Sequence, residues 1–425
     1  MTAKRPSTTG TILLKNGRII DPAQRVDETT DLLLTDGKVA AMGKTLICDG
    51  AQVVDCQGKW VVPGLVDVHC HLREPGAEHK ETIASGSLAA AHGGFTTIVA
   101  MANLNPVPDK ISTYQKIKKL IAQTAVVRVI QAASVTKELK GRDLCDMATL
   151  TAEGVTIFSD DGRYIDRASV LYQALKLAQK LNVVISLHEE DSTLKSYWPT
   201  AYDPVNEIAA IARDLEIVRA TNGRAHFQHL STAASVALIR RAKSEGLKVT
   251  AEVCPHHLTL TLPDVREQGT NAKMAPPVRD ATDIDALLAG LEDGTIDLIA
   301  TDHAPHAPAD KEVPFDLAAN GIVGFETALP VLLTQLVHER GIAPSWLIER
   351  MSAKPAAIFG LPVGSLATGM PADVCVIDPF YEWTIDKNAF VSKGRNTPYH
   401  GLAVKGRVWM TFVGGKVVFN ADVKA

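Results

Sequence analysis

Apolar and polar positions follow two different patterns along this chain of 425 residues. In residues 11–62, short apolar runs are separated by turn pairs such as Asn16-Gly17 and Asp36-Gly37, a pattern typical of β hairpins. The same pattern returns only near the C-terminus, where Gly414-Gly415 separates the last two runs. We therefore expect a β meander at the N-terminal end and one small β-sandwich domain built from both termini, residues 1–62 plus 362–425.

The middle of the chain, residues 63–361, alternates strand-like apolar runs with helical stretches. The predicted strands are Leu65–His69, Phe95–Met101, Val126–Ala133, Val155–Asp161, Val183–Glu189, Ala225–Leu230, Lys248–Val253 and Asp297–Asp302. The predicted helices between them include Lys80–His92, Ser112–Gln123, Ala168–Lys180, Glu207–Thr221 and Thr232–Glu245. Eight such repeats are typical of a (β/α)8 barrel, whose active site lies at the C-terminal ends of its strands. The expected fold class is α/β, a (β/α)8 TIM-type barrel with the small β-sandwich domain attached.

Composition narrows the classes of function and location. The net charge of -4 argues against a nucleic-acid-binding surface, and no apolar run reaches the roughly 20 residues of a membrane helix. The segment from Met1 to Gly10 is polar and lacks the apolar core of a signal peptide. The six cysteines form no CxxC pair, so we expect free thiols in a reducing compartment. These features predict a cytoplasmic protein that contacts neither nucleic acid nor membrane.

Histidines and carboxylates gather at the predicted strand ends. His69 and His71 are two residues apart, so in a strand they point to the same side and can chelate a divalent metal. The fifth predicted strand ends at His188 and the eighth at Asp302. The fourth and sixth strands each offer two candidates, which are Asp160 or Asp161 and His226 or His229. A single histidine at such a position is usually a surface or capping residue, but together they predict a site for one or two Zn²⁺ ions.

The same residues predict a class of reaction. A metal at this position would lower the pKa of bound water and polarise a carbonyl group. Asp302 would accept the proton of that water and pass it to a leaving nitrogen. Arg73, just beyond the first strand, would hold a substrate carboxylate through paired hydrogen bonds. The predicted reaction is hydrolysis, or its reverse, at an amide-like carbon of a small anionic molecule.

Two motifs resemble those of a known family. Asp67–Gly76, followed by His79-Lys80-Glu81 and Gly93–Thr97, is similar to the signature of type I dihydroorotases in the amidohydrolase superfamily. Ala300–His306 resembles the second signature of that family, and the likeness extends from about residue 10 to the end of the chain. The resemblance implies a zinc-dependent cyclic amide hydrolase. Its reaction would be the reversible cyclisation of N-carbamoyl-L-aspartate to L-dihydroorotate in de novo pyrimidine biosynthesis.

The resemblance also implies roles for individual residues. The implied metal ligands are His69, His71, Asp161, His188, His229 and Asp302. The implied substrate contacts are His71, Arg73, Asn103 and His306. Asp302 would double as the catalytic acid and base, and the segment 303–314 would be a mobile loop beside the substrate. The family further implies a homodimer, either free or docked on aspartate transcarbamoylase.

The chain departs from the family pattern at two places. Leu104 follows Asn103 where the family usually has Thr, and Ala102 replaces a Pro. Ala275 stands before Pro276-Pro277 where the family usually has an Asn that touches the substrate. Loss of that amide would cost about 1–3 kcal/mol if its partner stays unsatisfied. The departures concern substrate binding and leave the implied metal ligands intact.

Two other functions remain open from the sequence. One is a non-catalytic, dihydroorotase-like scaffold for aspartate transcarbamoylase, which would turn over no substrate with any metal. The other is a different cyclic amidase, such as a hydantoinase or an allantoinase. Those enzymes usually bridge their metals with a carboxylated lysine near strand four, whereas the stretch 155–161 contains no lysine.

Overall fold

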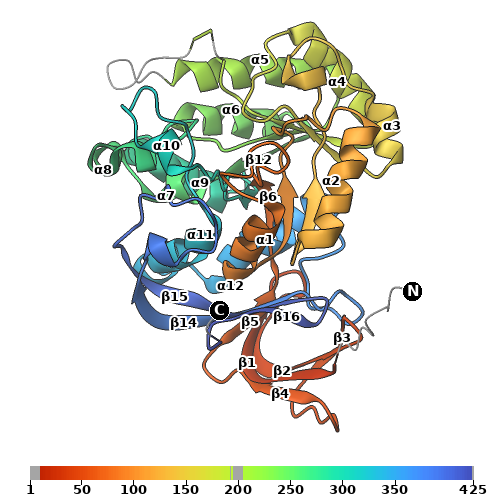
Figure 1. The fold of residues 1–425 in the computed structure, drawn as a ribbon, viewed down its shortest axis with the longest axis vertical. Coiled ribbons are helices and arrows are strands. Elements are labelled where there is room, and N and C mark those ends of the chain that lie inside the picture. The colour runs from red at the N-terminus through yellow and green to blue at the C-terminus, as the bar shows by residue number, and fades with distance from the viewer. Residues whose placement is uncertain (1–9, 192, 195–203, 424–425) are drawn as a thin grey trace.

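The computed structural model describes residues 10–191, 193–194 and 204–423. Figure 1 shows a part rich in helices, which surrounds the middle strands of the chain, and below it a sheet that combines the first and last strands. The red and the dark blue ends of the chain therefore meet in one place. No helix within the described ranges is both long enough and apolar enough to cross a membrane.

Eight parallel strands form the barrel. The first three are β6 (Leu65–Cys70), β7 (Phe95–Ala100) and β8 (Arg128–Gln131). The other five are β9 (Ile157–Ser159), β10 (Val184–Leu187), β11 (Ala225–Phe227), β12 (Val249–Val253) and β13 (Leu298–Ile299). Two parallel bridges, Ala133 to Phe158 and Cys70 to His303, join the two sheets into a closed ring. The predicted barrel is confirmed. Six of its strands end one to three residues earlier than expected because the chain turns into the loops that carry the polar residues, whereas β6 ends one residue later and β12 ends where predicted.

The inside of the barrel is packed. Val66, Val99, Ile157, Val184 and Leu298 come from five different strands and belong to one buried cluster. Side chains from strands all around a closed barrel can share a cluster only in its interior, so this cluster fills the barrel below the strand ends. The polar cluster described below lies above it, at the C-terminal end.

Helices separate the strands and cover the barrel. The longer ones are α1 (Ile83–His92), α2 (Ile111–Thr124), α4 (Ala168–Leu181), α5 (Val205–Thr221), α6 (Ala233–Ser244), α9 (Ala281–Glu292) and α11 (Phe325–Leu332). Shorter ones are α3 (Met147–Ala152), α7 (Pro255–Thr259), α8 (Leu262–Gln268), α10 (Pro308–Lys311), α12 (Pro344–Ile348) and α13 (Lys354–Ile358). Single turns of 3-10 or π helix lie at Lys137–Leu139, Gly269–Ala272, Leu333–Glu339, Glu349–Ala353 and Lys387–Ala389. Helix α1 begins three residues later than predicted because the Thr82 hydroxyl accepts a hydrogen bond from Ser85 N (3.1 Å) and caps the helix there.

The small sheet contains strands from both ends of the chain. Its members are β1 (Ile12–Asp21), β2 (Val26–Thr35), β3 (Lys38–Gly43), β4 (Gln52–Asp55), β5 (Trp60–Pro63), β14 (Val374–Thr384), β15 (Ala403–Val413) and β16 (Lys416–Asn420). Strand β5 pairs antiparallel with β14, and this pairing joins the two groups. Leu14 and Val61 share one core with Val374 and Phe412. The hairpins at Asp36-Gly37 and Gly414-Gly415 are confirmed, whereas the division at residues 62 and 362 stays a prediction.

The predicted meander is wrong in one respect. Asn16-Gly17 is not a hairpin turn, because β1 runs through it and its register with β2 shifts between Leu14 and Gly17. Asn16 has a φ of 61° and its backbone N–H donates to the Asp31 carboxylate (3.0 Å). A left-handed residue suits a bulge as well as a turn, which explains the error. Strands β4 and β5 then pair parallel with β1, so after β3 the chain returns to β1 instead of adding strands beside β3.

Candidate active site

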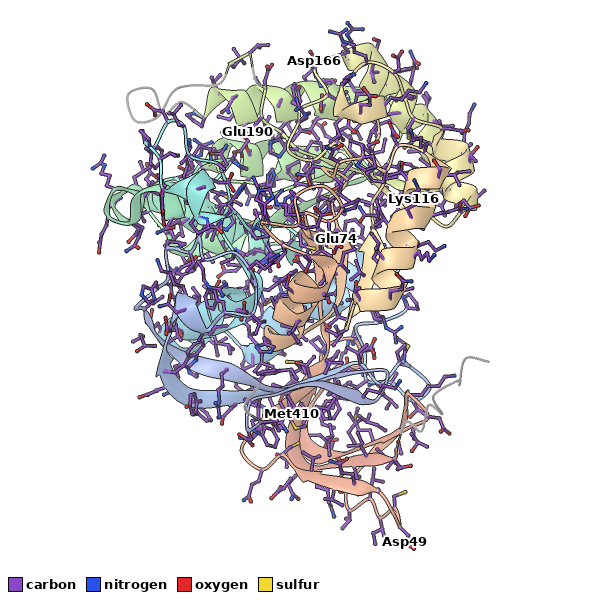
Figure 2. All side chains as sticks on the ribbon, in the orientation of Figure 1. Asp49, Glu74, Lys116, Asp166, Glu190 and Met410 are labelled. Carbon is purple, nitrogen blue, oxygen red and sulfur yellow. The ribbon has the colours of Figure 1, made fainter. Side chains whose placement is uncertain are left out.

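The predicted residues surround one cavity at the C-terminal ends of the barrel strands. This cavity has a volume of about 280 Å³ and is lined by five of the six implied metal ligands together with Arg73, Asn103 and His306. The sixth ligand, His69, is fully buried. Glu190, labelled in Figure 2, also lines the cavity and lies in the barrel part, far from the small sheet that carries Asp49 and Met410. The position agrees with the rule that barrel active sites form at this end.

Asp161 lies at the centre of the polar cluster. One of its oxygens, Oδ1, is 3.1 Å from His69 Nε2, 3.4 Å from His188 Nδ1 and 3.9 Å from His229 Nε2. The other oxygen is 3.3 Å from His71 Nε2. A carboxylate that faces histidines with both oxygens has the arrangement needed to bridge two metal ions.

Asp302 completes the opposite side of the cluster. Its Oδ1 lies 3.0 Å from His71 Nε2 and 3.5 Å from His69 Nε2. Two groups of three therefore have ligand atoms within 4.8 Å of one another, namely His69, His71 and Asp302, and His69, Asp161 and His229. His69 belongs to both groups, and its Nε2 can bind only one ion because its Nδ1 faces Glu252.

The donor atoms fit a divalent metal. His69 Nε2 and Asp161 Oδ1 are buried and have no hydrogen-bond partner among the described residues. Unpaired buried polar atoms are costly unless something binds them. Imidazole nitrogens and carboxylate oxygens are also the donors that zinc-class ions prefer when no thiolate is available. The residues present are therefore suited to hold such an ion.

The residue pattern left open which member of two pairs belongs to the site, and the structure decides between them. The Asp160 carboxylate accepts hydrogen bonds from Val135 N (2.8 Å), Thr136 N (3.0 Å) and the Thr136 hydroxyl, so it fixes a loop rather than the cluster. The His226 ring lies between Thr250 Oγ1 (2.9 Å) and Glu252 Oε2 (2.9 Å). Asp161 and His229 are the members of each pair that face the cavity.

Buried partners orient the cluster from below. Glu252 Oε1 is 2.6 Å from His69 Nδ1, which leaves the Nε2 atom of that ring directed at Asp161 and Asp302. A carboxylate behind a metal-binding histidine fixes its tautomer and its orientation. Asp67 acts at the end of the neighbouring strand β13, because its carboxylate accepts from Thr301 N (2.9 Å) and Thr301 Oγ1 (2.6 Å) just before Asp302.

Three residues of the cluster adopt a backbone conformation that non-glycine residues rarely use. The φ angles are 60° at Arg73, 33° at His229 and 45° at Asp302. Residues in the left-handed region cost of order 1–3 kcal/mol each and persist where the surroundings impose them. Each of the three follows the end of a barrel strand, so the turn that creates the strain also aims the side chain into the cavity.

Charges in the cluster are strongly coupled. Burial lowers the pKa of His69, but the carboxylates of Asp161, Asp302 and Glu252 outweigh burial and raise it well above its usual value. Burial lowers the pKa of His188, but the neighbouring carboxylates of Asp161 and Glu190 outweigh burial and raise it to about 9. The pKa of His229 is well below its usual value because of burial and the neighbouring histidines. The cluster therefore attracts positive charge, which in the absence of a metal falls on histidine protons.

The implied substrate contacts lie on the rim of the same cavity. Arg73 Nε donates to Pro305 O (3.3 Å), and Asn103 Oδ1 is 2.9 Å from His71 Nδ1. The His306 ring lies between Asn320 O (2.8 Å) and Lys80 Nζ (3.3 Å). Burial, Arg73 and Lys80 lower the pKa of His306 to about 3, so this ring is neutral. The roles of these residues as substrate contacts stay a prediction.

The two departures from the family pattern have different surroundings. Ala275 lines the cavity, so the cavity wall lacks the side-chain amide that the family usually has at this position. Leu104 is buried and is not among the residues that line the cavity. The segment 303–314 contains α10, and whether it moves stays a prediction.

Some residues at the cavity were not predicted. Glu190 lies beside a predicted strand end, so the sequence did carry a signal for it. Its Oε2 is 3.3 Å from His188 Nε2. Asn396 had none, because it comes from the distant segment between β14 and β15. Its carboxamide accepts from His306 N (3.0 Å) and donates to Ala304 O and Gly321 O (2.9 Å each). Contacts between segments so far apart in the chain leave no local pattern in the sequence.

Comparisons with known proteins agree on one group of relatives. A family model described as Dihydro-orotase-like matches residues 58–200. A protein named Dihydroorotase from Syntrophotalea carbinolica is 42% identical over 421 residues, which cover 96% of this chain and 99% of that protein. The Dihydroorotase of Bacillus cytotoxicus is 44% identical over 422 residues, 96% of this chain and 98% of that protein.

Solved structures share the fold. The L-hydantoinase (dihydropyrimidinase) from Arthrobacter aurescens superimposes with a TM-score of 0.89 at 28% identity, and the match covers 96% of both chains. A dihydropyrimidinase from Brevibacillus agri gives a TM-score of 0.86 at 23% identity over 96% of this chain and 95% of that one, a likeness of fold alone. A barrel with a sandwich domain is thus shared across nearly the full length.

Proposed function

From the premise that this chain belongs to the dihydroorotase family, we propose that it catalyses the reversible cyclisation of N-carbamoyl-L-aspartate to L-dihydroorotate. The observation that carries the proposal is the position of Asp161 and Asp302, which face the His69 and His71 pair from opposite sides at the mouth of the barrel. The reaction belongs to de novo pyrimidine biosynthesis, a cytoplasmic pathway in the expected reducing compartment.

We propose Zn²⁺ as the cofactor, with one or two ions per subunit. The residues that would hold it are His69, His71, Asp161, His188, His229 and Asp302. When bound, such an ion would polarise the substrate carbonyl and lower the pKa of a water molecule toward neutrality.

Asp302 is the proposed acid and base. During ring opening, its carboxylate takes a proton from the attacking water and delivers it to the ring nitrogen as the carbon–nitrogen bond breaks. In cyclisation, the same carboxylate takes a proton from the carbamoyl nitrogen as it attacks the protonated carboxyl carbon, and gives that proton to the departing hydroxide, which leaves as water. Its place 3.0 Å from His71 Nε2, at the wall of the cavity, supports this role.

Arg73 and Asn103 are proposed to position the substrate. Arg73 is a half-buried cation at the edge of the cavity, and its guanidinium suits the carboxylate that both substrates carry. Asn103 is oriented by His71, so it presents its amide group to the same space. His71 and His306 are the further proposed substrate contacts, and the His306 ring is held at the cavity wall by Asn320 O and Lys80 Nζ.

A hydantoinase-like activity is the second candidate. The observation that favours it is the close superposition on the L-hydantoinase from Arthrobacter aurescens. Against it stand the higher identity to proteins named Dihydroorotase and the position of Arg73, which suits a substrate with a free carboxylate. The non-catalytic scaffold is the third candidate, and it leaves the convergence of six ligand residues without a use.

The decisive experiment is turnover of L-dihydroorotate and N-carbamoyl-L-aspartate by the purified chain. It is measured as isolated, after removal of metal by a chelator, and after addition of Zn²⁺, with hydantoin as a parallel substrate. We expect activity that disappears with the chelator and returns with Zn²⁺. Turnover of hydantoin alone would favour the second candidate, a hydantoinase-like activity. If zinc-loaded protein turned over none of these substrates, the non-catalytic scaffold would be the candidate that fits.

We also propose a homodimer, free or docked on aspartate transcarbamoylase. The support is family membership, because the structure contains one chain. Sedimentation of the chain alone and with aspartate transcarbamoylase distinguishes the three states. A monomer under both conditions would contradict the proposal.

A further inference from the structure

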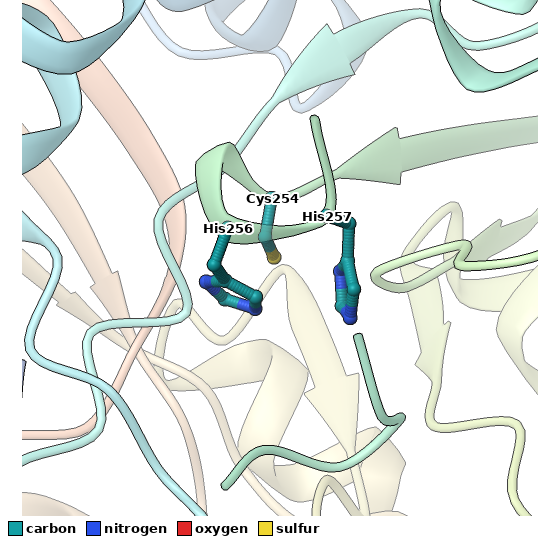
Figure 3. Close-up of side chains that lie close together, drawn as sticks. All are labelled: Cys254, His256 and His257. Atoms are coloured by element: carbon teal, nitrogen blue, oxygen red, sulfur yellow. The ribbon is translucent and has the colours of Figure 1, made fainter. Parts of the chain in front are cut away.

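A second cluster of metal-binding side chains lies beside the active site. Cys254, His256 and His257 follow β12 and form the start of α7, and their ligand atoms lie within 4.8 Å of one another. Figure 3 shows the Cys254 thiol placed between the two imidazole rings. All three side chains are buried, with exposures of 0 to 2%.

Two ring nitrogens of this cluster lack partners among the described residues. His257 Nε2 is 2.9 Å from Pro276 O, so that nitrogen carries the proton and donates it, and the lone pair is on Nδ1. His257 Nδ1 and His256 Nε2 are both buried without a hydrogen-bond partner among the described residues. A neutral imidazole that donates one N–H to a backbone carbonyl and keeps the other nitrogen free has the form of a metal ligand. Buried polar atoms left unpaired call for an explanation of this kind.

The cluster is separate from the catalytic one. None of its three side chains is among the residues that line the catalytic cavity, although Ala275, next to the carbonyl that His257 binds, does line it. The negative charges of Asp302, Glu252, Asp67 and Asp161 reach the Cys254 thiol. Such surroundings disfavour an isolated thiolate and favour a cation that binds to it.

We propose that Cys254, His256 and His257 bind a second, non-catalytic ion of the zinc class. One sulfur and two imidazole nitrogens are donors that such ions prefer, and three protein donors leave the fourth tetrahedral position for another ligand. Donor atoms around a tetrahedral zinc ion are about 3.5 Å apart, so small rotations of these side chains close the site. On binding, the Cys254 thiol loses its proton to solvent and its sulfur forms the bond to the metal. The ion would fix the end of β12 to the segment at Pro276 that backs the catalytic wall.

The test uses Co²⁺ as the probe. Thiolate ligands give Co²⁺ a charge-transfer band in the near ultraviolet, whereas the histidine and carboxylate ligands of the catalytic cluster give none. Metal-free full-length protein is titrated with Co²⁺ while the band and the bound metal are measured. We expect the band in the wild-type protein. We expect Cys254→Ser to lose the band and to bind one equivalent of metal fewer than the wild-type protein.

Cys145→Ser is the matched control. Cys145 is also a buried thiol, but its Sγ already donates to Ser134 O (2.9 Å), so this variant is expected to keep the band. His257→Gln is the second variant, and it is expected to lose the band while Cys254 remains present. Absence of the band from the wild-type protein would overturn the proposal without the need for any variant. Persistence of the band in Cys254→Ser would overturn it as well.

Discussion

At the scale of single residues, the candidate site depends on which oxygen or nitrogen each side chain presents. Asp160 and Asp161 are neighbours with the same functional group, yet one accepts backbone hydrogen bonds and the other faces four histidines. The sequence located the strand end but could not choose between them, and only the family resemblance pointed to Asp161. Side-chain direction after a strand end depends on the turn, and turns such as those at His229 and Asp302 are set by the whole barrel.

Asp302→Asn tests the proposed acid and base. Asparagine keeps the shape of the side chain but cannot take a proton, so we expect kcat to fall by about 10²–10⁴-fold. Metal content is measured alongside kinetics, because Asp302 also belongs to the metal cluster. A variant with full metal content and nearly normal kcat would contradict the role.

Glu252→Gln tests the orientation of His69 from behind. Burial raises the pKa of Glu252, but His69 and His226 lower it to about 2, so the group is a carboxylate at neutral pH. Glutamine keeps the size and loses the charge, and we expect the affinity for Zn²⁺ to fall by about 10–100-fold. Competition with a chelator measures this affinity, and saturating Zn²⁺ should restore much of the activity. Unchanged affinity would show that Glu252 serves only the fold.

Arg73→Lys tests the proposed substrate contact. Lysine keeps the charge but cannot form paired hydrogen bonds with a carboxylate. We expect KM for N-carbamoyl-L-aspartate to rise by about 10-fold or more, since hydrogen bonds to charged groups are worth about 1.5–3 kcal/mol, with a smaller change in kcat. Steady-state kinetics separate the two constants, and a change in kcat alone would assign Arg73 another task.

At the scale of elements, most strands and helices could be predicted, and the errors have physical causes. Periodic runs such as the one in α4 were placed within a residue or two, because burial of one helix face imposes the pattern. Asn16-Gly17 was misassigned since bulges and hairpins use the same left-handed residues. Most barrel strands were predicted one to three residues too long at their C-terminal ends, because the prediction counted as strand the polar residues at which the chain already turns into a loop.

The contact between α1 and β16 is expected to make stability depend on pH. His92 ends α1 and stacks on Phe419 of β16 with ring centroids 4.1 Å apart, and burial lowers its pKa from 6.5 to about 4. Between pH 4 and 6.5 the unfolded chain binds a proton that the folded chain does not. His92 therefore makes its full contribution to the free energy of unfolding above pH 6.5, and this contribution is lost as the pH falls toward 4.

His92→Gln should remove that dependence. We expect the difference in unfolding free energy between pH 7.5 and pH 4.5 to shrink by about 1–3 kcal/mol relative to wild type. Urea unfolding at both pH values measures it. His400→Gln is the control, because it is the same substitution at an exposed histidine. Equal pH dependence in wild type and His92→Gln would contradict the expectation.

At the scale of the whole molecule, the C-terminal part contributes to the barrel's active end. Asn396, between β14 and β15, binds the backbone at Ala304, His306 and Gly321, and its own carbonyl accepts from Val323 N (2.9 Å). The barrel alone therefore does not build the wall that carries His306. Contacts of this kind could not be predicted, since hairpin and helix signals describe only neighbours in sequence.

Asn396→Ala tests this connection. Loss of its side-chain hydrogen bonds should loosen the segment at His306, and we expect KM to rise about 10-fold and unfolding to become easier by about 1–3 kcal/mol. Kinetics and urea unfolding are compared with those of Asn388→Ala, an exposed residue of the same segment. If both variants behave alike, the segment does not support the active site.

The pairing of β5 with β14 has a consequence for synthesis. Trp60 to Pro63 are all buried, yet the strand that covers them begins about 310 residues later. At typical elongation rates of 5–20 residues per second, a ribosome needs roughly 15–60 s to supply it. During that time the nascent chain exposes an apolar strand edge with no partner. Cells that make this protein must therefore shield the first strands, and holdase chaperones are expected to bind the nascent chain between these two points.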